Sequence, residues 1–370
     1  MEPIRVLHIL HSMNRGGAEN AIMNYYRHID RNKVQFDFLL TEQSKCQFEE
    51  EIVALGGKVF RVPPLTSRRP WQYFRSVSSF FHNHPDYRIV HSHTSSKSIF
   101  PLCIAKRCGI PIRISHSHNT KSESGIRGLI RNSLKLFLGT VATNYCACGK
   151  EAAVWLYGEK LYDSGHVLIV PNVIETQAFV FSKAIRDEYR RRFHLSDKTI
   201  VLGSTARFSN QKNHPFLLSL FSEFHALVPD SALLLLGDGE LRGYLEDMAK
   251  DLGISDTVFF TGIVPNVADY EQAMDFFLMP SFYEGLPLSL VEAQVSGLKC
   301  FVSDTITKEA DKTGLVEYLP LANGPKYWAK SIMASIGYNR CSRQFDIMSA
   351  GYDATTSAHT LQEFYLSSMK

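Results

Sequence analysis

Short apolar runs and longer mixed segments alternate along the first half of the chain. The runs consist mostly of Val, Ile, Leu and Phe, which is typical of strands that are buried on both faces of a sheet. We predict strands at 4–10, 35–40, 58–62, 89–91 and 112–116, with helices from about residue 18 and at 48–55, 70–84 and 96–108. Because strands and helices alternate, the sequence predicts an α/β fold with a doubly wound parallel sheet.

The alternation restarts after a polar stretch in the middle of the chain. The second set has strands at 199–205, 232–237, 258–261, 275–279 and 300–302, with helices from about residue 215 and at 266–273, 287–296 and 357–369. A chain of 370 residues is too long for one typical core, so we expect two domains. We predict Rossmann-like domains at 1–172 and 197–352, a hinge at 173–196, and a C-terminal helix within 353–370 that crosses back to the first domain.

Composition and charge narrow the class of protein. Hydrophobic residues make up 45% and charged residues 21%, close to the soluble average, and no apolar run is long enough to span a membrane. The seven cysteines lack the spacing of a metal site, and the N-terminal sequence does not read as a signal peptide, so we expect a cytoplasmic protein.

The two halves of the chain differ in net charge. Residues 1–170 hold 22 Lys and Arg against 13 Asp and Glu, a net charge of +9, whereas residues 171–370 hold 18 Lys and Arg against 24 Asp and Glu, a net charge of −6. The basic half can face an anionic partner, but charge alone does not identify that partner.

The stretch 280–299 combines a loop with the start of a helix. Gly285 and Pro287 prevent a strand from continuing, and a helical pattern then begins. Glu284 lies in the loop, and Glu292 lies about a turn and a half inside the helix. Carboxylates that accept sugar hydroxyls, beside helix amides that bind a phosphate, suggest a sugar nucleotide. Taken alone, two glutamates around such a helix are more often ordinary solvated residues.

Two further loops carry groups that suit a diphosphate. Gly16 and Gly17 let the backbone approach a ligand at the start of a helix, although a tight turn without a ligand is the alternative. Arg207 and Lys212 follow the strand at 199–205 and can neutralise a departing nucleotide, unless they are solvated surface charges. The chain has no Asp-x-Asp, so we expect neither a metal nor a cofactor. Arg at position 242 breaks a G-x-G-x-x-G pattern, which argues against a dinucleotide.

Histidines gather at two predicted strand ends. His91 and His93 follow one strand, and His116 and His118 follow the next, so the imidazoles lie where α/β sheets bind ligands. A His-x-His pair can bind a metal, but the sequence offers no third ligand of suitable spacing, and histidines at strand ends often cap backbone groups. We therefore predict no metal site.

These motifs together resemble the family-four retaining glycosyltransferases. The glutamate stretch reads S-x-x-E-G-x-P-x-x-x-x-E-A, and R-G-G-A-E, H-S-H-N-T and R-x-x-x-x-K occur in the family's order over nearly the whole chain. I-P-I-R-I-S-H-S-H-N-T and S-D-x-I-T-x-E are similar to the bacterial exopolysaccharide and capsular polysaccharide branch, while a Gly-Gly pair common in the family after 300–302 is replaced. The resemblance implies a GT-B fold, with two Rossmann-like domains facing across a cleft.

The resemblance also implies an activity and residue roles. The expected reaction moves a hexose from a nucleoside diphosphate sugar to a saccharide or lipid-linked saccharide, with retention and without a metal; nucleic acid is not an expected partner. Glu284 would contact the donor sugar and Glu292 the ribose, and His118, with His116 as the competing choice, would lie near the anomeric carbon. The predicted catalytic residues are His118, Arg207, Lys212 and Glu284, and the predicted donor-binding residues are Gly16, Gly17, Gly262, Val264, Gly285, Leu286, Pro287, Leu288 and Glu292. Two alternatives stay open, a sugar-nucleotide epimerase or phosphorylase of the same architecture and a non-catalytic nucleotide-sugar-binding module.

A helical pattern at 126–141 indicates a surface that meets a membrane. Its apolar face comprises Ile126, Leu129, Ile130, Leu134 and Phe137, and its basic stripe comprises Arg127, Arg131 and Lys135. The apolar edge can enter the headgroup region while the cations meet anionic lipid. The alternative is that this face packs on the first sheet. With the basic first half, we predict peripheral association with an anionic membrane surface, the inner face of the cell membrane.

Overall fold

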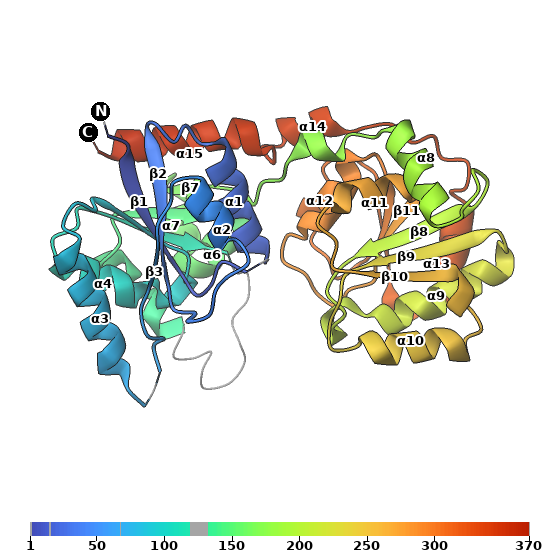
Figure 1. Cartoon of the computed structure of the whole chain (residues 1–370), viewed down its shortest axis with the longest axis horizontal. Coiled ribbons are helices and arrows are strands. Elements are labelled where there is room, and N and C mark those ends of the chain that lie inside the picture. The colour runs from blue at the N-terminus through green and yellow to red at the C-terminus, as the bar shows by residue number, and fades with distance from the viewer. Residues whose placement is uncertain (1, 15, 67, 119–131, 370) are drawn as a thin grey trace. The chain divides into compact units, whose positions relative to one another are not determined.

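The chain forms two compact units, each built around its own parallel sheet (Figure 1). The structure is a computed structural model that describes residues 2–14, 16–66, 68–118 and 132–369. Unit 1 consists of Met1–Ile174 and Asp353–Lys370, and unit 2 consists of Glu175–Tyr352. The chain therefore leaves unit 1, completes unit 2 and then returns to unit 1.

Unit 1 contains a seven-stranded parallel sheet in the order β3-β2-β1-β4-β5-β6-β7. The strands are β1 (Ile4–Leu10), β2 (Val34–Leu40), β3 (Val59–Arg61), β4 (Ile89–Ser92), β5 (Ile112–Ser117), β6 (Asn144–Ala147) and β7 (Val167–Ile169). The helices are α1 (Gly17–His28), α2 (Glu49–Ala54), α3 (Pro70–Asn83), α4 (Ile99–Arg107), α6 (Lys150–Tyr157), α7 (Glu159–Asp163) and α15 (Ala354–Ser368). Side chains alternate between the two faces of β1: Val6 packs with α1 and α15, whereas Leu7 packs with α3 and α4.

Unit 2 contains a six-stranded parallel sheet in the order β10-β9-β8-β11-β12-β13. The strands are β8 (Ile200–Thr205), β9 (Ser231–Leu236), β10 (Val258–Gly262), β11 (Phe276–Met279), β12 (Lys299–Ser303) and β13 (Val316–Leu319). The helices are α8 (Lys183–Arg192), α9 (His214–Leu227), α10 (Arg242–Asp251), α11 (Val267–Ala273), α12 (Leu288–Val295), α13 (Gly324–Met333) and α14 (Gln344–Ser349). Leu202 packs with α9 and α13 on one face of the sheet, and Val201 packs with α12 on the other.

Each sheet has a point at which the strand order reverses. In unit 1 the chain runs outward from β1 to β3 and then places β4 on the other side of β1; in unit 2 it runs from β8 to β10 and then places β11 on the other side of β8. Loops that leave adjacent strands at such a point diverge, so ligands of open α/β sheets bind there. The loops after β8 and β11 carry the cation and glutamate motifs. The predicted fold class is confirmed.

The segment predicted as a hinge contains α8, which packs on α11 in unit 2. Arg190 of α8 is buried, and its Nη2 lies 2.7 Å from Oδ2 of Asp275, while Nη2 of Arg186 lies 2.5 Å from Oδ1 of the same carboxylate. Because arginines rather than aliphatic side chains make this buried contact, the helix looks like a polar linker in the sequence.

Candidate active site

Lys212 and Glu284 meet where the strand order of unit 2 reverses. Lys212 lies in the loop after β8 and Glu284 in the loop after β11, and Nζ of Lys212 lies 2.6 Å from Oε1 of Glu284. Both side chains are largely buried, with 20% of Lys212 and 7% of Glu284 exposed. Two residues that were predicted from separate motifs thus form one ion pair.

Backbone contacts hold these two loops together. Asn213 has a φ of 54°, in the left-handed region that asparagine tolerates better than most residues, and its Nδ2 donates to the carbonyl oxygen of Pro280 at 3.1 Å. The amide of Phe282 donates to the carbonyl oxygen of Gln211 at 2.9 Å. The loop after β8 therefore fixes the position of the loop that carries Glu284.

The backbone after Glu284 leads directly into α12. This helix begins at Leu288, with Pro287 as its N-cap, so the first amides of α12 have no acceptor within the helix. A Cβ added to Gly285 would meet no atom within 4 Å, so packing inside unit 2 does not require a glycine there. A glycine would be required at this position if a ligand approached the backbone closely, because glycine has no Cβ. The geometry is compatible with the predicted phosphate contacts of Gly285, Leu286, Pro287 and Leu288, which stay a prediction.

Glu292 has a buried partner that the sequence reasoning missed. Glu271 of α11 is fully buried, and burial followed by the charge of Glu292 raises its pKa well above the ordinary value. Burial also raises the pKa of Glu292, to about 7. Oγ1 of Thr205 donates to Oε1 of Glu271 at 3.3 Å. The signal in the sequence was the position of Glu271 at the C-terminal end of α11, where Gln272 and Ala273 are also buried.

Arg207 lies at the surface of unit 2, and its predicted role at a diphosphate stays a prediction. The Arg207 side chain is 75% exposed, and its Nη2 lies 3.1 Å from Oε2 of Glu240; within the described parts of the chain it forms no ion pair with Glu284. A Cβ on Gly237 would lie 2.0 Å from the carbonyl oxygen of Ala206. This glycine therefore serves the packing of the β8 loop, which removes a reason for a dinucleotide reading.

The other predicted donor-binding positions lie at ends of elements. The amide of Gly237 donates to the carbonyl oxygen of Gly262 at 3.0 Å, and Val264 has a buried side chain. Gly16 is the N-cap of α1, which begins at Gly17. Oε2 of Glu19 would lie only 2.4 Å from a Cβ on Gly16, so this carboxylate lies against the N-terminus of α1. A carboxyl group of the chain therefore lies beside the position at which a donor phosphate was predicted.

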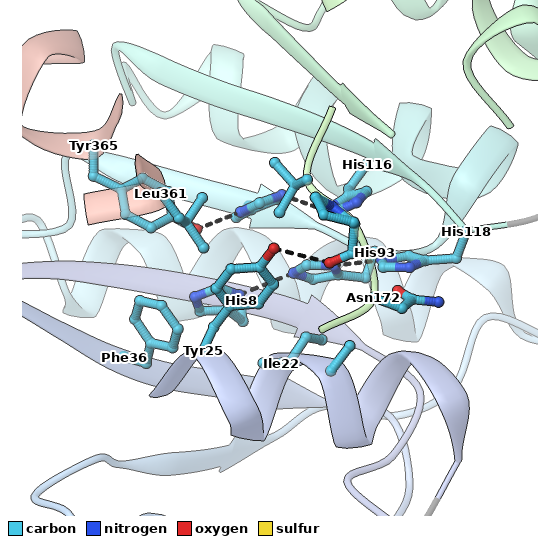
Figure 2. Close-up of a pocket in the computed structure, with 14 residues that line it drawn as sticks. His8, Ile22, Tyr25, Phe36, His93, His116, His118, Asn172, Leu361 and Tyr365 are labelled. Carbon is cyan, nitrogen blue, oxygen red and sulfur yellow. Dashed lines mark hydrogen bonds between the residues drawn. The ribbon is translucent and has the colours of Figure 1, made fainter. Parts of the chain in front are cut away.

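Five histidines of unit 1 form one histidine cluster, in which three are buried and His93 and His118 are half-buried: His8, His91, His93, His116 and His118 (Figure 2). Nδ1 of His8 lies 2.9 Å from Nε2 of His93, and Nδ1 of His93 lies 2.9 Å from Nε2 of His118. In a second pair, Nε2 of His91 lies 3.1 Å from Nδ1 of His116. The argument that no third histidine is available was wrong, because the register pairs His8 of β1 with His91 of β4.

Burial determines the charge of the histidine cluster. It lowers the pKa of His8 to about 3 and that of His118 to about 4. It also lowers the pKa of His91, His93 and His116 well below the usual value, with a further contribution from neighbouring imidazoles. The cluster is therefore uncharged at neutral pH. The structure places His116 and His118 in the same cluster and does not choose between them as the active-site histidine.

The predicted membrane-facing helix is only partly described. Ile126, Arg127, Leu129, Ile130 and Arg131 lie outside the described residues. In the part that is described, Nζ of Lys135 lies 3.7 Å from the ring centroid of Trp155 and donates to its carbonyl oxygen at 2.9 Å, while Phe137 is exposed. Among the helices of the described residues, none has the length and apolar character needed to cross a membrane.

Comparisons with known proteins give one consistent result. Residues 185–311 match the family model described as "Glycosyl transferases group 1", and residues 16–172 match "Glycosyl transferase 4-like domain". The chain is 37% identical over 368 residues to the EpsF protein of Bacillus subtilis (strain 168), which is named as a glycosyltransferase; the match covers 98% of this chain and 96% of EpsF. It is 23% identical to the capsular polysaccharide biosynthesis glycosyltransferase CapH of Staphylococcus aureus over 98% of this chain and 99% of CapH.

Two further similarities concern a named substrate and a solved structure. The chain is 27% identical over 225 residues to the Escherichia coli UDP-Gal:alpha-D-GlcNAc-diphosphoundecaprenol alpha-1,3-galactosyltransferase, covering 59% of this chain and 58% of that protein. The crystal structure of Anabaena HepE in complex with UDP-glucose matches with a TM-score of 0.77 at 17% identity, covering 98% of this chain and 99% of HepE.

Proposed function

Because this chain belongs to the group 1 glycosyl transferases, we propose that it moves a hexose to a hydroxyl group of a lipid-linked saccharide, with retention and with no metal ion at the diphosphate. Its fold is the GT-B fold, with parallel sheets of seven and six strands. Sugar transfer from a nucleoside diphosphate sugar follows from the family. The acceptor, the stereochemistry and the independence from metal are the proposal.

One observation carries the proposal for unit 2, the ion pair between Lys212 and Glu284. A lysine held beside a carboxylate at a switch point, next to the free amides of α12, offers both a cation for a diphosphate and an acceptor for sugar hydroxyls. When a donor binds, Glu284 exchanges part of its contact with Lys212 for a sugar hydroxyl. The ammonium group is then free to face the charge that develops on the phosphate.

The proposed step needs no nucleophilic side chain. The acceptor hydroxyl attacks the anomeric carbon on the face from which the diphosphate departs, so the new C–O bond forms where the old one breaks. The proton of the hydroxyl passes to the departing phosphate oxygen. Lys212 and Arg207 stabilise the negative charge on the leaving group, a role that a metal ion has in other sugar-nucleotide enzymes. The two glutamates bind the donor and do not attack it.

A relative and the charge of the first half support the lipid-linked acceptor. The name of the Escherichia coli relative specifies a sugar on diphosphoundecaprenol as the acceptor. The net charge of +9 on residues 1–170 suits an acceptor that carries a diphosphate at an anionic membrane. We therefore take GlcNAc-diphosphoundecaprenol as the first acceptor to test.

Replacing Lys212 with alanine tests the leaving-group role. We expect Lys212→Ala to lower turnover of UDP-glucose or UDP-galactose onto that acceptor by about a hundredfold, the usual effect of losing one electrostatic donor. Arg207→Ala should lower turnover as well, although its side chain is more exposed. Lys250→Ala, which removes an exposed lysine of the same unit, is the matched control. Added Mg²⁺ or Mn²⁺ should not raise the wild-type rate.

Three results would contradict this proposal. They are full activity of the folded Lys212→Ala variant, a requirement for Mg²⁺ or Mn²⁺ during turnover, and inversion at the anomeric carbon of the product. Release of free nucleotide without an acceptor would favour an epimerase or phosphorylase of the same architecture. Donor binding without turnover on any saccharide acceptor would favour a nucleotide-sugar-binding module.

A further inference from the structure

The histidine cluster of unit 1 contains two facing pairs of imidazoles, one stacked on the other. His91 faces His116, and His93 faces His118, through the nitrogens given above. The ring of His91 stacks on that of His93 with centroids 4.3 Å apart, and the ring of His116 stacks on that of His118 with centroids 4.0 Å apart. Ring nitrogens of both pairs therefore gather at the ends of β4 and β5.

We propose that the ends of β4 and β5 form a binding site for one divalent transition-metal ion of the zinc class, with His93, His116 and His118 as its three protein ligands. These three residues can each place one ring nitrogen within 4.8 Å of the others. Tetrahedral zinc has Zn–N bonds of about 2.0–2.1 Å, which correspond to about 3.3–3.4 Å between ligand nitrogens. The facing nitrogens of His93 and His118 are now 2.9 Å apart, so this pair need open by only a few tenths of an ångström. Both rings must also turn, because the two nitrogens now point at each other.

The hydrogen bonds around the cluster fit this assignment. Nδ1 of His91 lies 2.7 Å from Oη of Tyr365, and Nε2 of His93 lies 2.9 Å from Nδ1 of His8. Nε2 of His93 is the ring nitrogen that would not bind the ion, so His93 can keep its proton there. Such partners orient a histidine ligand and fix its tautomer. His8 is thus positioned as the outer partner of His93.

Each neutral imidazole carries one proton, which in the metal-bound state must lie on the ring nitrogen that does not bind the ion. Nε2 of His8 and Nε2 of His116 are buried, and neither has a hydrogen-bond partner within the described residues. An unpaired buried polar atom is costly, at about 1–3 kcal/mol. With an ion bound, each neutral ring carries its single proton on the nitrogen that faces away from the ion. Binding therefore requires a change of tautomer and no net loss of protons from the rings.

The size of the adjoining space limits the ligand. The cluster borders a cavity of about 10 Å³, which is closed by Ile22 and Tyr25 of α1 and by Leu361 of α15 (Figure 2). A volume of about 10–15 Å³ holds no more than one water molecule, so a sugar or a nucleotide does not fit. His93 and His118 are only half-buried, which gives an ion a route from the strand ends. Imidazole nitrogens bind transition-metal ions such as zinc in preference to Mg²⁺ or Ca²⁺, which prefer oxygen ligands.

The proposal does not depend on the transfer reaction and concerns residues of unit 1 only. Failure of the metal site would leave the Lys212 experiment unaffected, and failure of the Lys212 experiment would leave the metal site unaffected.

Cobalt binding by the full chain tests the site. After dialysis against a chelator, titration with Co²⁺ should give one bound ion per chain and the visible absorption bands of four-coordinate cobalt with nitrogen ligands. Zn²⁺ should remove these bands by displacement. His93→Ala should weaken Co²⁺ binding by at least about a hundredfold, because loss of an outer partner alone costs about 10–100-fold.

Matched variants separate loss of a ligand from loss of the fold. His118→Asn, at a half-buried strand end, should also weaken binding at least about a hundredfold. His166→Asn, an exposed histidine of unit 1 outside the cluster, should bind as the wild type does. Circular dichroism identifies which variants are folded. Absence of Co²⁺ bands in the folded wild type, or unchanged binding by a folded His93→Ala or His118→Asn variant, would overturn the proposal.

Discussion

Two carboxyl groups in unit 2 share one buried environment, and this affects its stability. Glu271 and Glu292 both have pKa values raised by burial, that of Glu292 to about 7. A carboxyl group whose pKa is higher in the folded chain than in the unfolded chain binds its proton more tightly when folded. Its contribution to stability is present at low pH and is lost as the pH rises through the folded pKa.

Replacing Glu271 with glutamine should make the free energy of unfolding of unit 2 less dependent on pH. Glutamine has the shape of the protonated acid but no proton to lose. The decline in stability as the pH rises above the ordinary pKa of a glutamate should therefore become shallower, by about 1.4 kcal/mol per pH unit for one proton. Urea denaturation at several pH values measures this slope. Asp247→Asn, at an exposed acidic residue, should leave the slope unchanged. An unchanged slope in Glu271→Gln would show that Glu271 is ionised in the native chain.

Residues of the site were predictable where a short motif contained them. Lys212 and Glu284 each lie in such a motif, so the sequence identified both, but only the structure shows that they form an ion pair. Glu271 and His8 lie inside ordinary elements, a helix and an apolar strand. Their proximity to Glu292 and His91 depends on how separate elements pack and on strand register, which local pattern does not specify.

Among the elements, those with strong apolar periodicity were predicted and those without it were missed. The first strand was predicted with the bounds of β1, Ile4–Leu10. In contrast, β6 (Asn-Tyr-Cys-Ala) and β13 (Val-Glu-Tyr-Leu) are short and mix polar with apolar residues, so they lack the continuous apolar run of a buried strand, and neither was predicted. The buried contacts of α8 are made by Arg190 and Tyr189, so its sequence resembles a solvated linker.

The helix predicted at 126–141 gives a test at the scale of one element. Lys135 is held by Trp155, so the arginines at 127 and 131 are the better probes of lipid contact. Wild-type protein should sediment with vesicles that contain phosphatidylglycerol, and less so at high salt. Changing Arg127 and Arg131 together to Glu should weaken this binding at least about tenfold, since each charge contributes about 1 kcal/mol.

A matched double variant serves as the control for charge. Changing Arg68 and Arg69 to Glu removes two exposed arginines of the same unit and should have the smaller effect on sedimentation. Equal losses in both double variants would mean that only net charge matters. No sedimentation of the wild type would remove the membrane surface from the proposed function.

At the scale of the whole molecule, unit 1 is discontinuous in sequence and unit 2 is not. Helix α15 completes unit 1: Leu361 and Tyr365 are buried in its core, and Oδ2 of Asp353 caps the helix by accepting from the amide of Thr356 at 3.1 Å. Burial of Leu361 and Tyr365 alone stabilises unit 1 by about 3–6 kcal/mol. Domains have a total stability of about 5–15 kcal/mol, so α15 contributes a large share.

A chain that ends at residue 352 should therefore lose unit 1 and keep unit 2. Hydrogen exchange followed by mass spectrometry should show fast exchange in β1, β2 and β4, with protection retained in β8, β9 and β11. A chain that ends after Leu366 keeps Tyr365 and should exchange nearly as the full chain does. Retained protection of β1 in the shorter chain would show that the core of unit 1 is stable without α15.

The return of the chain to unit 1 also sets the order in which the two units can fold on the ribosome. Strands β1 to β7 emerge first, but α15, which packs on one face of their sheet, is translated only after all of unit 2. At about 5–20 residues per second, translation of unit 2 takes about 10–35 seconds. During that time the nascent first sheet exposes an apolar face to chaperones and to neighbouring chains. A premature stop codon anywhere in unit 2 would therefore remove the stability of residues that were translated long before it.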